Sequence, residues 1–276
     1  MYLRDTATPI TLNEDGSLMS DKEYLNYDLM VGRCLAPKRN SLTPYLSSRA
    51  KEPTRIAEDR RARIKSEKKL VESFISLFAP RVDHMVATEF DCSNGIADLV
   101  IVELGEWSPN GKQISQVNSR WLYALAMLPY RRAFHIDSFT ASAGTTHRRA
   151  VEAMQEFCEA GFCRASRGQN MWLKAYQPRK VLKRTCAIEA KLSDWRRALS
   201  QANRYKDFAN EVWVLMDSAS VSAAASNIEE FKRQNIGLVA ISSSKEVDFL
   251  FVPAFDNPRS DSREWQANGL MAALIT

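Results

Sequence analysis

The chain has 276 residues, of which 45% are hydrophobic and 26% are charged, and its formal net charge is +5. These values are typical of a globular protein with room for two modest domains, and the positive charge is compatible with a polyanionic partner without demanding one. Five cysteines without a C-x-x-C pair argue against a disulfide framework or a zinc site, and no apolar run or leader-like start predicts a membrane segment, so we expect a cytoplasmic protein with no membrane partner.

The first segment, 1–53, is interpreted as an N-terminal extension, with a short helix predicted from about Asp21 to Val31. A basic stretch follows from Lys38 to Arg63. Such a stretch could contact a nucleic-acid backbone. It is more typical of a solvated face that continues into a helix, and we favour that interpretation.

The next helix is predicted from about Thr54 to Phe78 and ends before Pro80. Its apolar positions between 70 and 78 point on average in the direction of Glu67, whereas Glu72 points nearly opposite, toward solvent. A glutamate on the buried side of a helix needs a partner. Glu67 is therefore a candidate site residue; the alternative is that it only interacts favourably with the helix dipole.

Two strands are predicted next, Val82–Phe90 and Ile96–Val102, joined by a turn that ends in Asn94-Gly95, a strong signal for an antiparallel hairpin. Asp98 lies near the start of the second strand. An acid at the start of a buried strand is costly unless it is paired or binds a metal ion. Asp98 is therefore a second candidate, although an aspartate at a turn or a sheet edge would fit the same pattern.

About eighty residues separate this strand from the next strand of the core, which is too long for a loop and predicts an inserted domain over 106–178. The insert contains three predicted helices, at 121–128, 135–143 and 145–160, followed by two short strands, at 162–166 and 171–176. This order of helices, turn and hairpin resembles a winged helix-turn-helix DNA-binding domain.

The resemblance implies a recognition helix whose first turn enters the major groove and a wing that contacts phosphates or the minor groove. Winged helices also serve as protein-interaction modules, and that alternative stays open. We expect the insert to fold as an independent unit. The residues expected to contact DNA are Thr146, His147, Arg148 and Arg149 at the helix start and Arg164, Arg167 and Lys174 in the wing.

The core resumes with a strand from Thr185 to Lys191, whose residues alternate with a period of two. Glu189 and Lys191 leave the same face of this strand, side by side. A carboxylate can bind a divalent cation, and a lysine beside it can orient an attacking water or stabilise negative charge on a phosphate. This pair therefore predicts a site for phosphate chemistry.

A helix capped by Ser193-Asp194 follows and runs to about Ala209. Gln201 and Tyr205 lie one turn apart on it, close to the preceding strand, although ordinary packing at the helix flank would explain both equally well. The rest of the core is predicted as a strand at 211–216, a helix at 227–235 and strands at 237–241 and 247–252. The tail, 257–276, is polar and then apolar, and could dock on a partner or on the core.

Taken in order, these elements resemble the PD-(D/E)XK nuclease superfamily. Asp98 matches its single acid, Glu189-Ala190-Lys191 its E-x-K signature, and Gln201 with Tyr205 the Q-x-x-x-Y feature of several branches. Glu67 would be the helix acid of many members. The residue before Asp98 is Ala97 rather than proline, a variation that many members show.

The resemblance covers about 64–103 and 181–253. It implies an α/β protein with a restriction-endonuclease-like core, a central mixed sheet flanked by helices. We assign this core to 54–105 and 179–256, interrupted by the mainly α winged-helix domain at 106–178.

The implied activity is that of a Mg²⁺-dependent deoxyribonuclease, an endonuclease or nickase acting on double-stranded DNA in restriction, phage defence, transposon-end cleavage or repair. Asp98 and Glu189 would bind Mg²⁺, or Mn²⁺ as a substitute, with Glu67 holding the ion directly or through water. Lys191 would position the attacking water, and Gln201 would belong to the catalytic set. Alternatives are a non-catalytic DNA-binding regulator and a nuclease subunit that is active only within a larger complex. Besides double-stranded DNA, the expected partners include a second copy of the chain in a homodimer or the members of a larger protein complex.

Overall fold

The structure is a computed structural model, and it describes residues 63–77, 84–93, 95–105 and 109–275. The predicted N-terminal extension, most of the basic stretch and the first part of the predicted helix at 54–78 lie outside the described residues. The part of that helix that is described, α3, spans Glu67–Ile75 and begins at Ser66, whose hydroxyl accepts a hydrogen bond from the backbone N–H of Lys69.

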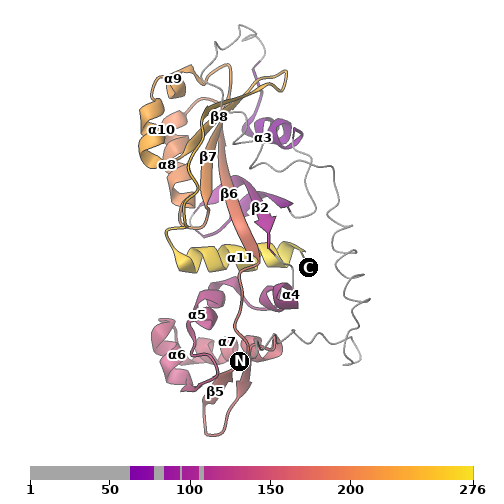
Figure 1. Ribbon diagram of the computed structural model, residues 1–276, viewed down its shortest axis with the longest axis vertical. Coiled ribbons are helices and arrows are strands. Elements are labelled where there is room, and N and C mark those ends of the chain that lie inside the picture. The colour runs from indigo at the N-terminus through magenta and orange to yellow at the C-terminus, as the bar shows by residue number, and fades with distance from the viewer. Residues whose placement is uncertain (1–62, 78–83, 94, 106–108, 276) are drawn as a thin grey trace, which may run out of the picture.

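A six-stranded mixed sheet forms the centre of the larger half of the molecule (Figure 1). Its first two strand pairings in space are antiparallel, the next two are parallel, and the last is antiparallel. The α/β core with a mixed sheet is therefore as predicted. In spatial order the strands are β1 (His84–Asp91), β2 (Ile96–Leu104), β6 (Leu182–Lys191), β7 (Glu211–Asp217), β8 (Gly237–Ile241) and β9 (Val247–Phe251).

Helices cover both faces of this sheet. On one face Leu70, Val71 and Phe74 of α3 pack on apolar side chains of β2, β6 and β7. On the other face lie α8 (Trp195–Tyr205), α9 (Ser222–Ala225) and α10 (Ile228–Gln234), whose buried side chains belong to a second apolar cluster. All seven residues of β7 are buried, as expected for a central strand with helices on both sides.

The insert leaves the sheet after β2 and returns at β6. Three of its helices occupy the predicted segments, and the last of them, α7, is capped by Thr146. The first helix of the insert, α4, was not predicted. A short strand before α6 was not predicted, and it completes a three-stranded antiparallel sheet in the order β3-β5-β4. The elements are α4 (Pro109–Ser115), the short 3₁₀ helix η1 (Ser119–Trp121), α5 (Leu122–Met127), β3 (Ala133–His135), α6 (Ile136–Ser142), α7 (His147–Glu159), β4 (Cys163–Ala165) and β5 (Met171–Lys174).

The predicted tail contains a helix, α11 (Asp261–Ile275), which lies between the core and the insert (Figure 1). It packs on α4, η1 and α5, and it carries buried side chains that join the apolar interior of the insert to that of the core in a single cluster. Part of the interior of the insert is thus supplied by α11, which argues against the expectation that the insert folds as an independent unit.

Polar contacts attach α11 to the core. The buried side chain of Asn268 accepts hydrogen bonds from the backbone N–H groups of Val181 (2.8 Å) and Leu182 (2.9 Å), at the start of β6. Gln266 donates to the hydroxyl of Ser93 in the turn between β1 and β2 (2.8 Å). Among the described helices, none is long and apolar enough to cross a membrane.

Candidate functional site

Asp98 and Glu189 lie on the neighbouring strands β2 and β6. Leu99 pairs with Ile188 across these antiparallel strands, so one further step along the register brings Asp98 opposite Glu189, with both side chains on the α8 face. The Asp98 carboxylate accepts a hydrogen bond from the backbone N–H of Ala190 (2.7 Å). Burial, opposed by this hydrogen bond and assisted by the charge of Glu189, raises the pKa of Asp98 to about 6.

Glu189 is almost completely buried, with 1% of its side chain exposed, and both of its carboxylate oxygens have partners. The ammonium of Lys191 lies 2.9 Å from one oxygen. The hydroxyl of Tyr205, on α8, donates to the other and also lies 2.6 Å from the carbonyl oxygen of Ile96. A buried carboxylate is tolerated here because a cation and a hydroxyl compensate for its lost hydration.

Lys191 also contacts Glu67. Its ammonium lies 3.2 Å from the Glu67 carboxylate, which approaches from α3, the helix on the opposite face of the sheet. Burial alone would lower the pKa of Lys191, but the hydrogen bond and the charge of Glu189 outweigh it and raise that pKa, so Lys191 is a cation at neutral pH. Glu67 thus lies at the site, as predicted, through its contact with Lys191.

Gln201 and Tyr205 differ in what they contact. Tyr205 makes the direct contact with Glu189. The amide oxygen of Gln201, one helical turn earlier, is buried and has no hydrogen-bond partner in the described part of the chain. A buried, unpaired acceptor is costly, so this oxygen is suited to a donor or a cation that the protein itself does not supply.

The residues of this site offer oxygen ligands to a metal ion. No group of three or more His, Cys, Asp or Glu side chains within the described ranges is arranged to hold one. Two carboxylates on adjacent strands and an unpaired amide oxygen on the helix that covers them are nevertheless the oxygen ligands that Mg²⁺ and Mn²⁺ prefer. Because Lys191 is paired with Glu189, a cation binding at that oxygen would have to displace the ammonium group.

The predicted DNA-contacting residues of the insert are mostly exposed, at the start of α7 and between β4 and β5. Thr146 caps α7 and accepts from the backbone N–H of Arg149 (3.5 Å). His147 lies 3.7 Å from Asp137, and Arg148 forms an ion pair with Glu152 (3.0 Å). Arg164 and Arg167 are also exposed.

Lys174 is the exception, and its assignment to a DNA-contacting wing is wrong. The side chain is fully buried, and its ammonium donates to the carbonyl oxygens of Leu125 (3.2 Å) and Ala126 (2.9 Å) at the end of α5. Burial lowers its pKa to about 8. Lys174 therefore satisfies helix carbonyls inside the insert and cannot reach a phosphate.

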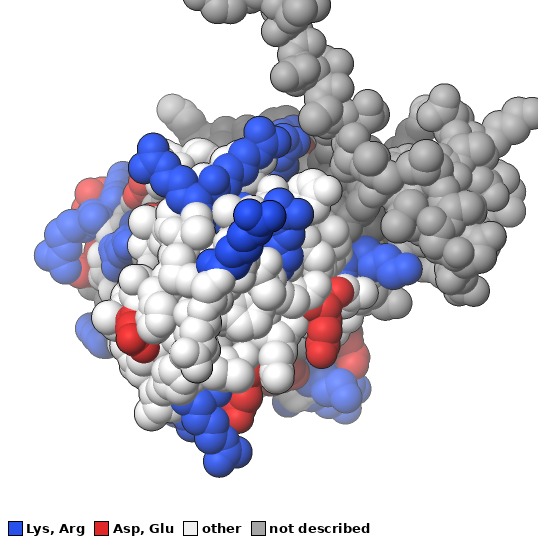
Figure 2. Space-filling view, turned by 90° about the horizontal axis from the view of Figure 1, so that it is seen from below, with Lys and Arg blue, Asp and Glu red and all other residues white. Residues whose placement is uncertain are grey.

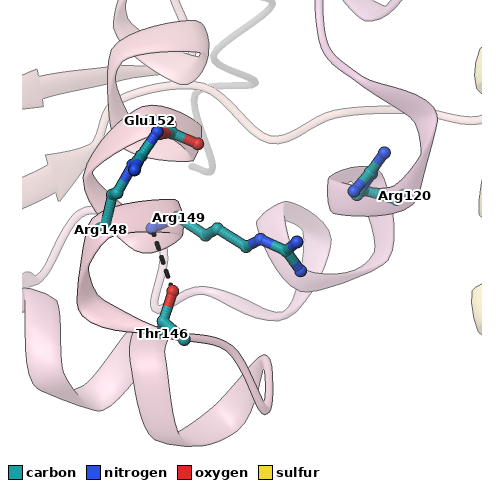
Figure 3. Close-up of a pocket in the computed structure, with 5 residues that line it drawn as sticks. All are labelled: Arg120, Thr146, Arg148, Arg149 and Glu152. Carbon is teal, nitrogen blue, oxygen red and sulfur yellow. Dashed lines mark hydrogen bonds and ion pairs between the residues drawn. The ribbon is translucent and has the colours of Figure 1, made fainter.

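Sequence reasoning missed one basic residue of this surface, Arg120 of η1. Together with Thr146, Arg148, Arg149 and Glu152 it lines an open hollow of about 740 Å³ (Figure 3). The sequence feature that could have indicated Arg120 is the absence of acidic residues between Glu106 and Asp137, which leaves the basic residues of this segment without nearby acidic residues in the sequence. Seen from the insert end of the molecule, a group of Lys and Arg side chains crosses the upper part of the surface, with acidic side chains toward its margins (Figure 2).

Comparison with protein-family models, with curated proteins and with solved structures gave no match. Functional assignment therefore depends on the residues of this chain alone, namely the acidic site on β2 and β6 and the basic surface of the insert.

Proposed function

We propose that this chain is a metal-dependent DNA endonuclease or nickase of the PD-(D/E)XK type, directed to duplex DNA by its insert. The observation that carries the proposal is the joining of Asp98, Glu189 and Lys191 in one partly buried polar cluster on two adjacent strands. Catalytic sites typically contain ionisable groups whose pKa values are shifted, because neighbouring charges offset the cost of burial only in part. The order helix, strand, strand, strand, helix, strand around the insert supports the same family.

Each residue has a role that follows from its contacts. Asp98 and Glu189 would hold Mg²⁺, with Mn²⁺ as a substitute and Glu67 beside them; when bound, such an ion stabilises negative charge on phosphate oxygens. Lys191, released from Glu189, would orient the attacking water and stabilise charge on the phosphate. Tyr205 fixes the Glu189 carboxylate from α8, and Gln201 offers its unpaired oxygen to the same region.

The insert would supply affinity for duplex DNA as a winged helix-turn-helix domain. The order from α5 to β5, with a sheet in the order β3-β5-β4, supports this assignment. Between residues 106 and 178 there are nine Lys and Arg against five Asp and Glu, a net charge of +4. A positive surface of this kind favours a phosphate backbone as its partner.

A second candidate is a DNA-binding protein without cleavage activity of its own, either a regulator or a subunit that cuts only within a larger complex. Both oxygens of Glu189 are already paired, and the described residues contain no ready-made cluster of metal-ligating side chains. A site that is closed by Lys191 could depend on a partner, or on bound DNA, to open it.

Nicking of supercoiled plasmid by the purified chain with Mg²⁺ or Mn²⁺ tests the proposal. We expect cleavage that requires the metal and is lost in Asp98→Asn, while duplex binding in EDTA is kept. Lys183→Ala is a matched control, because Lys183 lies on the same strand but pairs with Glu103 at the surface. Metal-independent cleavage, or full activity of Asp98→Asn, would contradict the nuclease assignment; binding without cleavage would favour the second candidate.

A further inference from the structure

The hollow at the start of α7 brings together cationic side chains from two separate elements, Arg120 from η1 and Arg148 and Arg149 from α7. Figure 3 shows the Arg149 side chain extending from α7 toward η1, where Arg120 lies. The two elements are adjacent in space because Asn118, just before η1, donates its backbone N–H to Glu156 of α7 (2.8 Å). The hollow is thus formed by the fold, and does not depend on the helix start alone.

Arg120 is held in place. Its Nε donates to the side-chain oxygen of Asn118 (3.2 Å), which also accepts from the backbone N–H of Arg120 and so caps η1. The guanidinium carbon lies 5.9 Å from the centre of the Trp121 ring. Arg120 lines the hollow, and these contacts restrict its side chain, which reduces the entropy lost when it binds a ligand.

Arg149 lacks this kind of support. Its guanidinium has no ion pair or hydrogen bond with any residue in the described part of the chain. Two unneutralised guanidinium groups facing one hollow repel each other unless an anion lies between them. The carboxylate in the hollow, Glu152, does not supply this charge to Arg149, because it is paired with Arg148.

We infer that Arg120 and Arg149 form a clamp for one phosphate group of duplex DNA, which rests on the proposed function of the insert. A phosphate offers the oxygens that paired guanidinium groups bind best. This assigns Arg149 to the sugar-phosphate backbone rather than to base edges. Arg148, whose side chain is 90% exposed, then remains the arginine of this helix that is free to reach a base once it leaves Glu152.

The clamp is tested by fluorescence anisotropy with the full chain and a labelled duplex in EDTA, so that cleavage plays no part. We expect Arg120→Ala and Arg149→Ala each to weaken binding about tenfold, for duplexes of any sequence, and to lower the slope of log K against log salt by up to about one. Because both side chains hold the same phosphate, the double variant should lose less than the product of the two single effects. Arg120→Lys, which keeps the charge but not the fork of donors, should recover only part of the affinity.

Arg196→Ala is the matched control, since Arg196 also lies over a neighbouring tryptophan, Trp195, but on the surface of α8. It should bind as the unaltered chain does. Glu152→Gln removes the only carboxylate that lines the hollow among the described residues, and we expect it to tighten binding.

The inference is overturned if Arg120→Ala and Arg149→Ala, with unchanged thermal melting, bind duplex as tightly as Arg196→Ala does, or if their two effects multiply independently. An effect confined to one DNA sequence would also overturn it, because it would indicate base reading. None of these outcomes depends on cleavage, so failure of the nuclease proposal and failure of the clamp are distinguished by separate measurements.

Discussion

Lys191 neutralises the buried carboxylate of Glu189 from two residues away on the same strand, at a distance of 2.9 Å. It also reaches Glu67, 3.2 Å away on α3, so that one ammonium group connects a sheet and the helix on its other face. In the described structure Lys191 therefore supplies the positive charge that the acids of the site require. A group proposed for catalysis is at the same time part of what holds the site together.

Lys191→Ala should consequently abolish cleavage and also destabilise the fold, by about 3 kcal/mol, because it leaves Glu189 buried without its cation. Urea unfolding at pH 7 measures the loss of stability, and nicking of supercoiled plasmid measures the loss of cleavage. Lys183→Ala, which breaks an exposed pair with Glu103, should cost less than about 1 kcal/mol, and an equal cost for the two variants would contradict the argument.

Tyr205→Phe removes the hydroxyl that donates to Glu189 while keeping the ring packed on α8. We expect a loss of about 2 kcal/mol in the free energy of unfolding, because the carboxylate keeps only Lys191 as a partner. Plasmid nicking should fall as Glu189 loses its fixed orientation, while duplex binding in EDTA should not change. Tyr130→Phe, at an exposed position of the insert, is the control and should alter neither stability nor nicking.

Lys174 makes the stability of the protein depend on pH in the alkaline range. Its pKa is lowered from 10.5 to about 8, so the unfolded chain binds the extra proton between these values and the free energy of unfolding should rise as pH increases through that window. The full rise is about 3 kcal/mol. Lys174→Met lacks the titrating group, so the difference between the two unfolding profiles isolates it. If the free energies of unfolding of the unaltered chain and of Lys174→Met change in parallel from pH 7 to pH 10, the ammonium group is better solvated than its burial indicates.

Gly269 allows α11 to approach the insert closely. A β-carbon at this position would lie 2.4 Å from a methyl carbon of Leu122 and 3.0 Å from the α-carbon of Ser119. Replacing glycine by alanine favours a helix by about 1 kcal/mol, but the clash should cost more, roughly 1–3 kcal/mol, and move α11 away from η1. Gly269→Ala should therefore lower the melting temperature, whereas Ala273→Ser, exposed on the same helix, should not; a stabilised Gly269→Ala would show that the two elements can separate freely.

The sequence was most informative where one element carried both a periodic pattern and a charged residue that broke it. Glu189 and Asp98 interrupt apolar stretches of their strands. In the structure both acids belong to the polar cluster that contains Lys191. Their adjacency was implied by the family resemblance, because β2 and β6 pair across the insert and no hairpin turn sets their register. The contact of Tyr205 with Glu189 could be inferred only as proximity, since helix phase does not determine which side chain of a turn reaches the sheet.

Lys174 was misread and α11 was not predicted as a helix, for different physical reasons. Lysine has a long apolar stem and is usually exposed, so a lysine on a hairpin was assigned to solvent although its ammonium satisfies two carbonyl groups inside the insert. Helix α11 is contacted on one side by the insert and on another by the core, so its apolar residues do not form a single stripe. Without a stripe the pattern of an amphipathic helix is absent.

The position of α11 in the chain also sets an order of events during translation. The ribosome completes the insert at about residue 178, but its packing partner begins only at Asp261. Until then the side of η1 and α5 that α11 will cover is exposed on the nascent chain, where such apolar surface is open to chaperones and to aggregation. The strands that carry Asp98 and Glu189 can pair earlier. The acidic site can therefore assemble on the growing chain before the insert is fixed in place.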